Sequence, residues 1–216
     1  MTIREKEGCS VGMKGSKSVT VQTKKRYDRI SAIYDLLDKL TVSHQLREKA
    51  VSLARGSVLE VGVGTGINLP LYSQDSTLTG IDLSSKMLQK ARARAQALNI
   101  QVNLLQMDLQ HLDFPDNNFD TVLATCVFCS VPDPVLGLQE VRRVCKRDGQ
   151  VILLEHMRSE IPLLGLFMDI LNPLAVRTIG NNINRWTLDN IKKAGLNIIR
   201  VENLKADIYK LVVASP

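Results

Sequence analysis

An apolar strand that runs directly into a glycine-rich turn is the feature that most limits what this chain can fold into. Residues 57–64 (SVLEVGVG) are typical of a buried strand, and the strand opens the pattern Glu60-Val-Gly62-Val-Gly64-Thr-Gly66. Glycines at this spacing allow the backbone to turn tightly and to approach a bound ligand with no Cβ in the way. The pattern therefore predicts either a ligand-binding turn or a plain turn between a strand and a helix.

Strands and helices alternate along the rest of the chain, which predicts an α/β fold with a doubly wound, seven-stranded, mostly parallel sheet. Ser84 and the pair Asp133-Pro134 are start signals for two of the helices. The last two strands are too close in sequence for a helix between them, so they predict a C-terminal antiparallel hairpin. The expected strands are 57–64, 77–82, 101–106, 119–125, 150–155, 196–202 and 207–214, and the expected helices are 24–40, 44–54, a short one after the glycine turn, 84–98, one opening at 134, and 187–194.

The positive charge of the chain is concentrated at its start. The 216 residues carry a net charge of +6, and residues 1–30 hold eight basic and three acidic side chains, which leaves +1 for residues 31–216. Residues 1–23 are polar and aperiodic, so we expect a flexible basic N-terminal arm followed by one folded domain over 24–216. A nearly neutral body disfavours a nucleic-acid-binding protein.

Cysteines and apolar segments indicate a cytoplasmic protein with reduced thiols. Cys126 and Cys129 have C-x-x-C spacing, but no second pair and no histidine cluster completes a zinc site, so we expect no metal, with a redox pair as the minor alternative. Residues 1–20 lack the apolar centre of a signal peptide. The apolar stretch 161–179 is interrupted by polar residues and a proline, so it is not expected to span a membrane.

Three carboxylates follow three consecutive expected strands. Glu60 lies at the end of the first strand, Asp82 ends the second, and Asp108 lies just beyond the third. The carboxyl ends of parallel strands open on one crevice, and an acid after the second strand of such a fold accepts hydrogen bonds from ribose hydroxyls. The spacing therefore predicts a site for a nucleoside-containing ligand.

The runs VLEVGVGTG, GIDLS, MDLQHLDFPDNNFD and EVRRVCKRDGQVILLEH resemble the class I S-adenosylmethionine-dependent methyltransferases, over residues 24–214. The pattern E-x-G-x-G-x-G differs from the G-x-G-x-x-G of nicotinamide-binding sites. RYDRISAIYDLLD, GVGTGINLPLY, CVFCSVPDP and NNINRWTLDNIKKAG are similar to ubiquinone/menaquinone-biosynthesis methyltransferases and bacterial phosphatidylethanolamine N-methyltransferases. The resemblance implies S-adenosyl-L-methionine as cofactor and a lipophilic acceptor, either the amine of a phosphatidylethanolamine-like lipid or a quinone precursor or small thiol.

The resemblance also implies residue roles. The three glycines pass beneath the methionine part of the cofactor, an acid binds the ribose, and apolar side chains flank the adenine. The implied cofactor-binding residues are Glu60, Gly62, Gly64 and Gly66 for the methionine part, Asp82 for the ribose, Leu83, Met87, Asp108 and Leu109 for the adenine, and Cys126 with Val127 for the methyl-transfer pocket.

Catalytic candidates follow from the chemistry of an amine acceptor, which must lose a proton to be methylated. His156 follows an expected strand at the carboxyl edge and is either a base or a structural histidine, and Glu155 is either a base or a strand cap. Tyr27 and Tyr34 lie seven residues apart on one helix face and either pack in the core or reach the sulfonium. In the related families the N-terminal helices (24–55) form a lid.

Substrate contacts are expected from aromatic and basic side chains late in the chain. Phe128 and Trp186 could complete a cation-binding cage with the two tyrosines, and Arg185 binds a substrate phosphate or forms a surface salt bridge. The apolar insertion 158–180 either covers the pocket or lies among lipid headgroups. The predicted contacts with an anionic membrane, on its inner face, are residues 1–30 and 161–179.

Overall fold

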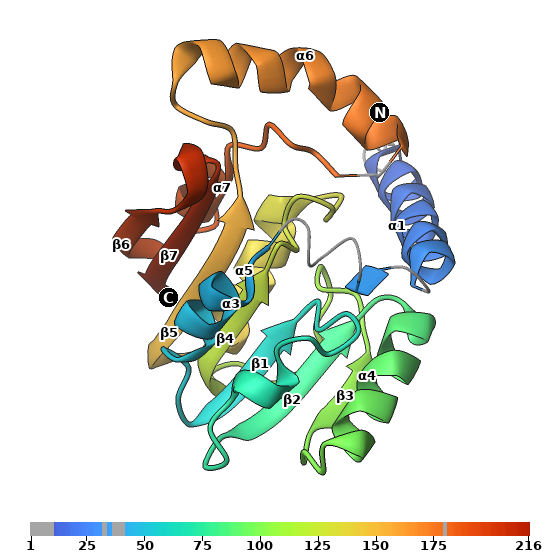
Figure 1. The fold of residues 1–216 in the computed structure, drawn as a ribbon, viewed down its shortest axis with the longest axis vertical. Helices are drawn as coiled ribbons and strands as arrows, with labels where there is room; N and C mark the ends of the chain where they lie inside the picture. Colours follow the sequence, from blue (N-terminus) through green and yellow to red (C-terminus); the bar gives the residue numbers. More distant parts are fainter. Residues whose placement is uncertain (1–10, 32–33, 36–41, 179–180) are drawn as a thin grey trace, which may run out of the picture.

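A computed structural model describes residues 11–31, 34–35, 42–178 and 181–216 and contains a seven-stranded sheet (Figure 1). The strand order is β3-β2-β1-β4-β5-β7-β6; β1 to β5 are parallel, and β7 runs antiparallel to both β5 and β6. The predicted doubly wound sheet with a C-terminal antiparallel hairpin is confirmed. The strands are β1 Ser57–Val61, β2 Thr77–Asp82, β3 Asn103–Gln106, β4 Phe119–Thr125, β5 Cys145–His156, β6 Asn197–Asn203 and β7 Tyr209–Ser215.

Helices cover both faces of the sheet because its central strands are apolar on both sides. On one face, α5 (Pro134–Val144) and α7 (Thr187–Lys193) pack on the strands, and on the other face lie α3 (His44–Val51) and α4 (Ser85–Ala97). The predicted caps are present: Ser84 Oγ accepts from the Met87 N–H at 3.1 Å and Asp133 Oδ1 from the Leu136 N–H at 3.0 Å.

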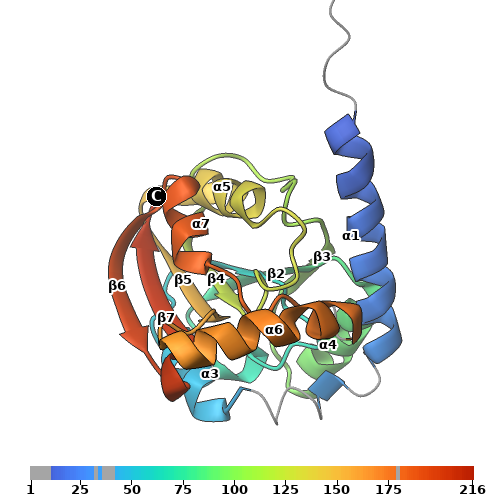
Figure 2. The same cartoon turned by 90° about the horizontal axis from the view of Figure 1, so that it is seen from above.

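The N-terminal helix differs from its prediction. Helix α1 spans Val11–Ile30, so the prediction of an irregular arm over 1–23 is wrong from Val11 onward, while residues 1–10, 32–33 and 36–41 lie outside the described part. Contacts with the rest of the domain stabilise a helix that the local sequence does not favour by itself. Thr20 Oγ accepts from Gln110 Nε2 at 3.3 Å, and Asp28 accepts from Ser84 Oγ at 2.5 Å. These contacts hold α1 along the edge of the sheet (Figure 2).

Two smaller expectations also need correction. The predicted helix after the glycine turn is a single 3₁₀ turn, η1 (Leu69–Leu71), which contains a proline. The strand expected over 150–155 is longer, because β5 starts at Cys145 and changes register against β4 between Phe119 and Thr121. A long strand with an irregularity therefore replaces the short strand that was expected.

Helix α6 (Pro162–Thr178) lies across the carboxyl edge of the sheet and ends near α1 (Figures 1 and 2). Its Asp169 carboxylate accepts from Arg158 Nη2 at 2.8 Å and from Asn184 Nδ2 at 3.0 Å, and Asn172 Oδ1 accepts from the Ile183 N–H at 2.9 Å. Polar contacts thus attach one side of the helix to the domain.

The segment before α6 is held to the β6–β7 hairpin by a buried lysine. Lys210 Nζ donates to Asp207 Oδ1 at 2.6 Å, to Asn203 Oδ1 at 3.0 Å and to Glu160 Oε1 at 3.2 Å. The Asp207 carboxylate also accepts from the Glu160 N–H at 2.7 Å and from Ser159 Oγ at 3.2 Å. A buried ammonium with three oxygen partners is fully hydrogen-bonded, so this cluster fixes where α6 begins.

Candidate active site

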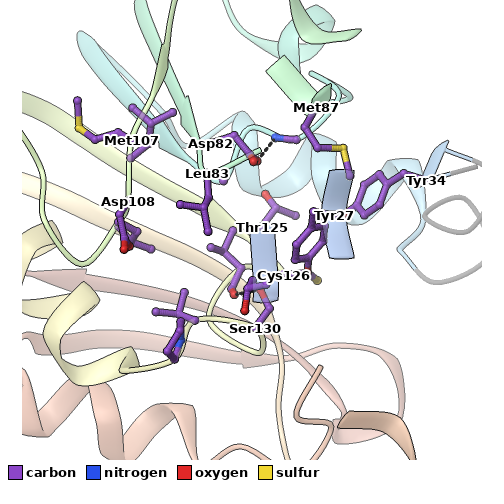
Figure 3. Close-up of a pocket in the computed structure, with 18 residues that line it drawn as sticks. Tyr27, Tyr34, Asp82, Leu83, Met87, Met107, Asp108, Thr125, Cys126 and Ser130 are labelled. Atoms are coloured by element: carbon purple, nitrogen blue, oxygen red, sulfur yellow. Dashed lines mark hydrogen bonds between the residues drawn. The ribbon is translucent and has the colours of Figure 1, made fainter. Parts of the chain in front are cut away.

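A pocket opens at the carboxyl ends of β1, β2 and β4, where the parallel strands meet the loops that follow them (Figure 3). It holds about 690 Å³ of empty space, part of it open to solvent. Glycine backbone, two aspartates, two tyrosines and several apolar side chains form its wall. The lining residues are Thr23, Tyr27, Tyr34, Gly62, Gly64, Ile81, Asp82, Leu83, Met87, Met107, Asp108, Leu109, Thr125, Cys126, Val127, Ser130, Val131 and Pro132.

The glycine turn after β1 has a left-handed backbone at Gly62, Gly64 and Gly66, with φ of +66°, +57° and +76°. A Cβ on Gly62 would lie 2.5 Å from Val127 Cγ2, and one on Gly66 would lie 2.7 Å from Leu69 Cδ1. At Gly64 the nearest atoms are 3.9 Å away. The outer two glycines therefore permit close packing, whereas Gly64 leaves open space on the pocket side.

Asp82 lies at the centre of the pocket wall and binds the glycine turn. Its Oδ2 accepts from the Gly64 N–H at 2.9 Å, the contact drawn in Figure 3, and its Oδ1 accepts from the Ser84 N–H at 2.7 Å. Burial raises the pKa of this carboxyl to about 6. Each oxygen keeps a lone pair for a ligand, since a carboxylate can accept about four hydrogen bonds.

Asp108 is oriented by Gln110, a residue that the motifs did not single out. Asp108 Oδ1 accepts from the Gln110 N–H at 2.9 Å and from Gln110 Nε2 at 3.1 Å. Gln110 is buried and also accepts from the Asp133 N–H at 3.0 Å through its Oε1. In the sequence, only the position of Gln110, two residues after Asp108, indicated that it belongs to the site. Its partners on α1 and near α5 are distant in sequence.

The loop after β4 forms the opposite wall and is held by Glu155. Cys126 has a φ of +55°, after which the Val127 and Phe128 N–H groups donate to Glu155 Oε1 at 2.8 and 3.1 Å. Burial raises the pKa of Glu155 to about 7. Phe128 was expected to bind substrate, but its side chain is fully buried in the core. The reversal of backbone direction at Cys126 turns Phe128 inward.

Glu60 lies behind the pocket rather than in its wall. It is 2% exposed, and its carboxylate accepts from Asn68 Nδ2 at 2.8 Å and from the Tyr72 hydroxyl at 3.0 Å. Burial raises the pKa of Glu60 to about 7. Neither Glu60 nor Gly66 is among the residues that line the pocket, and their contact with the ligand stays a prediction.

Tyr27 and Tyr34 close the pocket from the side of α1. Their ring centroids are 6.2 Å apart with planes inclined at 59°, and the Tyr27 hydroxyl donates to Asn181 Oδ1 at 3.3 Å. Burial raises the pKa of Tyr27 well above its usual range, so the phenol stays protonated at neutral pH. Both tyrosines line the pocket (Figure 3), but the prediction that one face of a single helix carries them is wrong, because α1 ends at Ile30 and Tyr34 lies beyond its end.

Comparison with known proteins identifies the family. Residues 59–153 match a model described as a methyltransferase domain. The phosphatidylethanolamine N-methyltransferase of Cereibacter sphaeroides is 44% identical over 137 residues, which cover 61% of this chain and 68% of that protein. The chain belongs to the S-adenosylmethionine-dependent methyltransferases. Its cofactor is S-adenosyl-L-methionine.

Other similar proteins agree with this family. The demethylmenaquinone methyltransferase of Clavibacter sepedonicus is 27% identical over 217 residues, 88% of each chain. The YcgJ protein of Bacillus subtilis superposes with a TM-score of 0.64 at 25% identity, covering 74% of this chain and 73% of that one. An S-adenosylmethionine-dependent methyltransferase from Thermotoga maritima shares the fold, with a TM-score of 0.69 at 20% identity over 88% of this chain and 98% of that one.

Three predicted residues of this methyltransferase are not part of the pocket wall. His156 stacks edge-on against Tyr209 with centroids 5.3 Å apart, and burial lowers its pKa. Arg185 Nη2 donates to the Val131 carbonyl at 2.8 Å, so it supports the wall from behind. Trp186 is 56% exposed beneath the Arg158 guanidinium, which lies 4.8 Å from its ring. The chain brings these residues close to the pocket end of the sheet, but their side chains pack on other parts of the protein.

Two cysteines, Cys129 and Cys145, are buried free thiols. Burial raises the pKa of Cys129 far above its usual range. Within the ranges that the structure describes, no three His, Cys, Asp or Glu side chains gather as a metal site. The described residues therefore provide a binding pocket for an organic cofactor, formed from backbone, carboxylates and apolar side chains.

Proposed function

We propose that this methyltransferase transfers the methyl group of S-adenosylmethionine to the headgroup amine of a phosphatidylethanolamine-like phospholipid. The relative from Cereibacter sphaeroides supports the acceptor, because it is named for that reaction and is 44% identical. The observation that carries the proposal is a pocket with two different ends. Carboxylates and glycine backbone lie at the sheet, and opposite them are the rings of Tyr27, on α1, and Tyr34, beyond the end of α1.

The sheet side of the pocket suits the cofactor. Asp82 presents free lone pairs to ribose hydroxyls, and Gly64 leaves the space that the methionine part needs. Asp108, held by Gln110, accepts from the adenine amino group between apolar neighbours. The residues proposed to contact the cofactor are Gly62, Gly64, Asp82, Leu83, Met87, Asp108, Leu109, Cys126 and Val127, with Glu60 and Gly66 supporting the turn.

The α1 side suits a cationic centre. The bound cofactor supplies a methyl group already activated on a sulfonium, so the protein must mainly align the acceptor and exclude water; orientation of this kind contributes about 7–11 kcal/mol. Tyr27 and Tyr34 offer ring faces that attract a cation, here the sulfonium and the positive charge that develops on the nitrogen during methyl transfer. The protonated Tyr27 hydroxyl also has lone pairs that accept from the amine N–H groups. We assign positioning of the amine to these tyrosines.

Among the described residues of the pocket wall, no base is left unassigned for proton removal from the amine. His156, predicted from sequence, lies outside the lining and is packed on Tyr209. The lining carboxylates, Asp82 and Asp108, are assigned to the cofactor. The amine is therefore proposed to enter neutral after losing its proton to solvent, which makes the rate increase with pH up to the pKa of the lipid amine.

A quinone precursor is the second candidate acceptor. The Clavibacter sepedonicus relative, named demethylmenaquinone methyltransferase, aligns over 88% of both chains.

Both candidates are lipophilic, so we propose that the protein works peripherally on the inner face of the membrane, in contact through residues 1–30 and 161–179. No helix in the described ranges has the length and apolar character needed to cross a bilayer.

The test measures transfer of a radiolabelled methyl group to purified acceptors. We expect label in phosphatidylethanolamine presented in vesicles and none in a demethylated menaquinone precursor in the same vesicles. Asp82→Ala should abolish transfer, whereas Asp75→Ala, at an exposed acid far from the pocket lining, should behave as wild type. Label only in the quinone would refute the amine acceptor and leave the methyltransferase assignment intact.

A further inference from the structure

Helix α6 exposes a row of large apolar side chains to solvent. Leu163 is 80% exposed, Ile170 67% and Leu174 60%. Spacings of seven and four residues place these three on one helix face, and a contiguous patch of this kind on a soluble domain marks an interaction site. The exposed apolar residues of this surface, which we call the α6 face, are Ile161, Leu163, Leu166, Phe167, Ile170, Leu171 and Leu174.

The opposite side of α6 is fixed to the domain, so the α6 face cannot turn inward. Asp169 is bound by Arg158 and Asn184, and a Cβ on Gly165 would lie 2.6 Å from Arg158 Nη1. Met168 is buried beneath the helix. The polar and small residues of the helix therefore face the protein and its bulky apolar residues face outward.

The charge around the α6 face suits an anionic or neutral lipid surface. The charged residues of α6 are Asp169, which is paired toward the domain, and Arg177 in the last turn, which is exposed. Lys25 and Arg29 of α1 are exposed as well. The exposed side of the helix thus presents no acid and ends at a base, the pattern of a helix that lies in a membrane interface. The exposed acid just before the helix, Glu160, is paired with Lys210.

The α6 face is also connected to the pocket rim. The chain that follows α6 binds the rim directly: Asn181 accepts from the Tyr27 hydroxyl, and the Asn182 N–H donates to the Cys129 carbonyl at 2.9 Å. The C-terminal end of α6 lies near α1, whose Tyr27 lines the pocket (Figures 1 and 2). A lipid monolayer against this helix would therefore lie close to the opening.

We infer that α6 is an interfacial helix that inserts its apolar face into a phospholipid monolayer and holds the pocket opening at the headgroup level. The inference deepens the proposed function and rests on it. Hydrophobic insertion, more than the basic charge of the N-terminal region, provides the affinity. A convex helix with a base at its end fits a fluid lipid surface, whereas a second copy of the chain would need a matching groove.

Flotation of the whole protein with vesicles of pure phosphatidylcholine tests the inference, because these vesicles contain neither net charge nor an acceptor amine. We expect wild type to bind them at low and at high salt. Leu163→Glu/Ile170→Glu should lower the bound fraction at least roughly tenfold. The matched control is Ile199→Glu, at a position that is 65% exposed on β6, and it should bind as wild type.

Calorimetric binding of S-adenosylmethionine to all three proteins shows that each is folded. Equal vesicle binding by wild type and the double variant would overturn the inference, as would binding that requires anionic lipid and vanishes in high salt. A concentration-dependent dimer that the double variant disperses, with no vesicle binding, would also overturn it and assign the α6 face to self-association. Normal vesicle binding without methylation of any amine lipid would instead refute the proposed acceptor alone.

Discussion

Alanine at Gly62 and at Gly64 should separate two roles of the glycine turn. Both residues have a left-handed backbone, with φ of +66° and +57°, so an alanine side chain strains both positions similarly. Their surroundings differ, because a Cβ on Gly62 overlaps Val127 Cγ2 at 2.5 Å, while a Cβ on Gly64 finds no atom nearer than 3.9 Å. The two substitutions therefore share a backbone cost and differ in packing.

The expected loss of stability follows from these contacts. A left-handed backbone costs an L-residue roughly 1–2 kcal/mol, which is the whole effect at Gly64. Overpacking against the β-branched Val127 adds about 1–3 kcal/mol at Gly62, since Val127 has few rotamers with which to move aside. Gly64→Ala should thus lower the free energy of unfolding by about 1–2 kcal/mol, and Gly62→Ala by about 2–5 kcal/mol.

Cofactor binding should respond differently from stability. The alanine methyl at position 64 would project toward Tyr34 Cε1, 3.9 Å away, into space that the cofactor is proposed to occupy. We expect Gly64→Ala to weaken S-adenosylmethionine binding at least tenfold, or about 1.4 kcal/mol. Urea unfolding without cofactor and titration calorimetry measure the two quantities. Equal unfolding free energies for the two variants, or normal cofactor affinity in Gly64→Ala, would refute this interpretation of the turn.

Three further predictions concern buried charges. Affinity for S-adenosylmethionine should fall as pH drops below about 6, because protonation of Asp82 removes a charged acceptor, and calorimetry on Asp82→Ala should show weak, pH-insensitive binding. Burial raises the pKa of Glu60 and Glu155 from 4.5 to about 7, so the folded state favours their protonated forms. The free energy of unfolding of the cofactor-free protein, measured in urea, should therefore fall from pH 5 to pH 8, and it should fall less steeply in Glu60→Gln. Lys210→Met leaves the Asp207 carboxylate without its cation and should cost about 3 kcal/mol in the same assay, and a loss below 1 kcal/mol would contradict the proposed anchoring of α6.

Periodicity and caps predicted the sheet well because they depend on local physics. Apolar runs of strand length between capped amphipathic helices leave a parallel sheet as the only way to bury both strand faces. The predicted bounds of β2 and β4 agree with the structure, and Ser84 and Asp133 cap their helices as expected. Nine of the eleven predicted cofactor residues line the pocket for the same reason, since strand ends determine where they lie.

Side-chain direction beyond a strand end was not predictable in the same way. Phe128 lies two residues after Cys126, whose left-handed backbone redirects the chain so that Phe128 enters the core, and nothing local in a cysteine indicates that conformation. His156 ends β5 in register with Tyr209, a partner 53 residues later, which decides where the imidazole packs. Helix α1 likewise begins early because of contacts at Thr20 with a residue 90 positions away.

Four carboxylates at the pocket end of the sheet divide into two pairs with different roles. Glu60 and Glu155 are buried behind the walls, where each accepts hydrogen bonds that hold a loop, and their raised pKa values are the cost of that burial. Asp82 and Asp108 remain in the wall for the ligand. Because the sheet side is held by these buried carboxylates, we propose that the acceptor enters on the opposite side, between α1 and the chain following α6, where the Tyr27 hydroxyl donates to Asn181 Oδ1 at 3.3 Å.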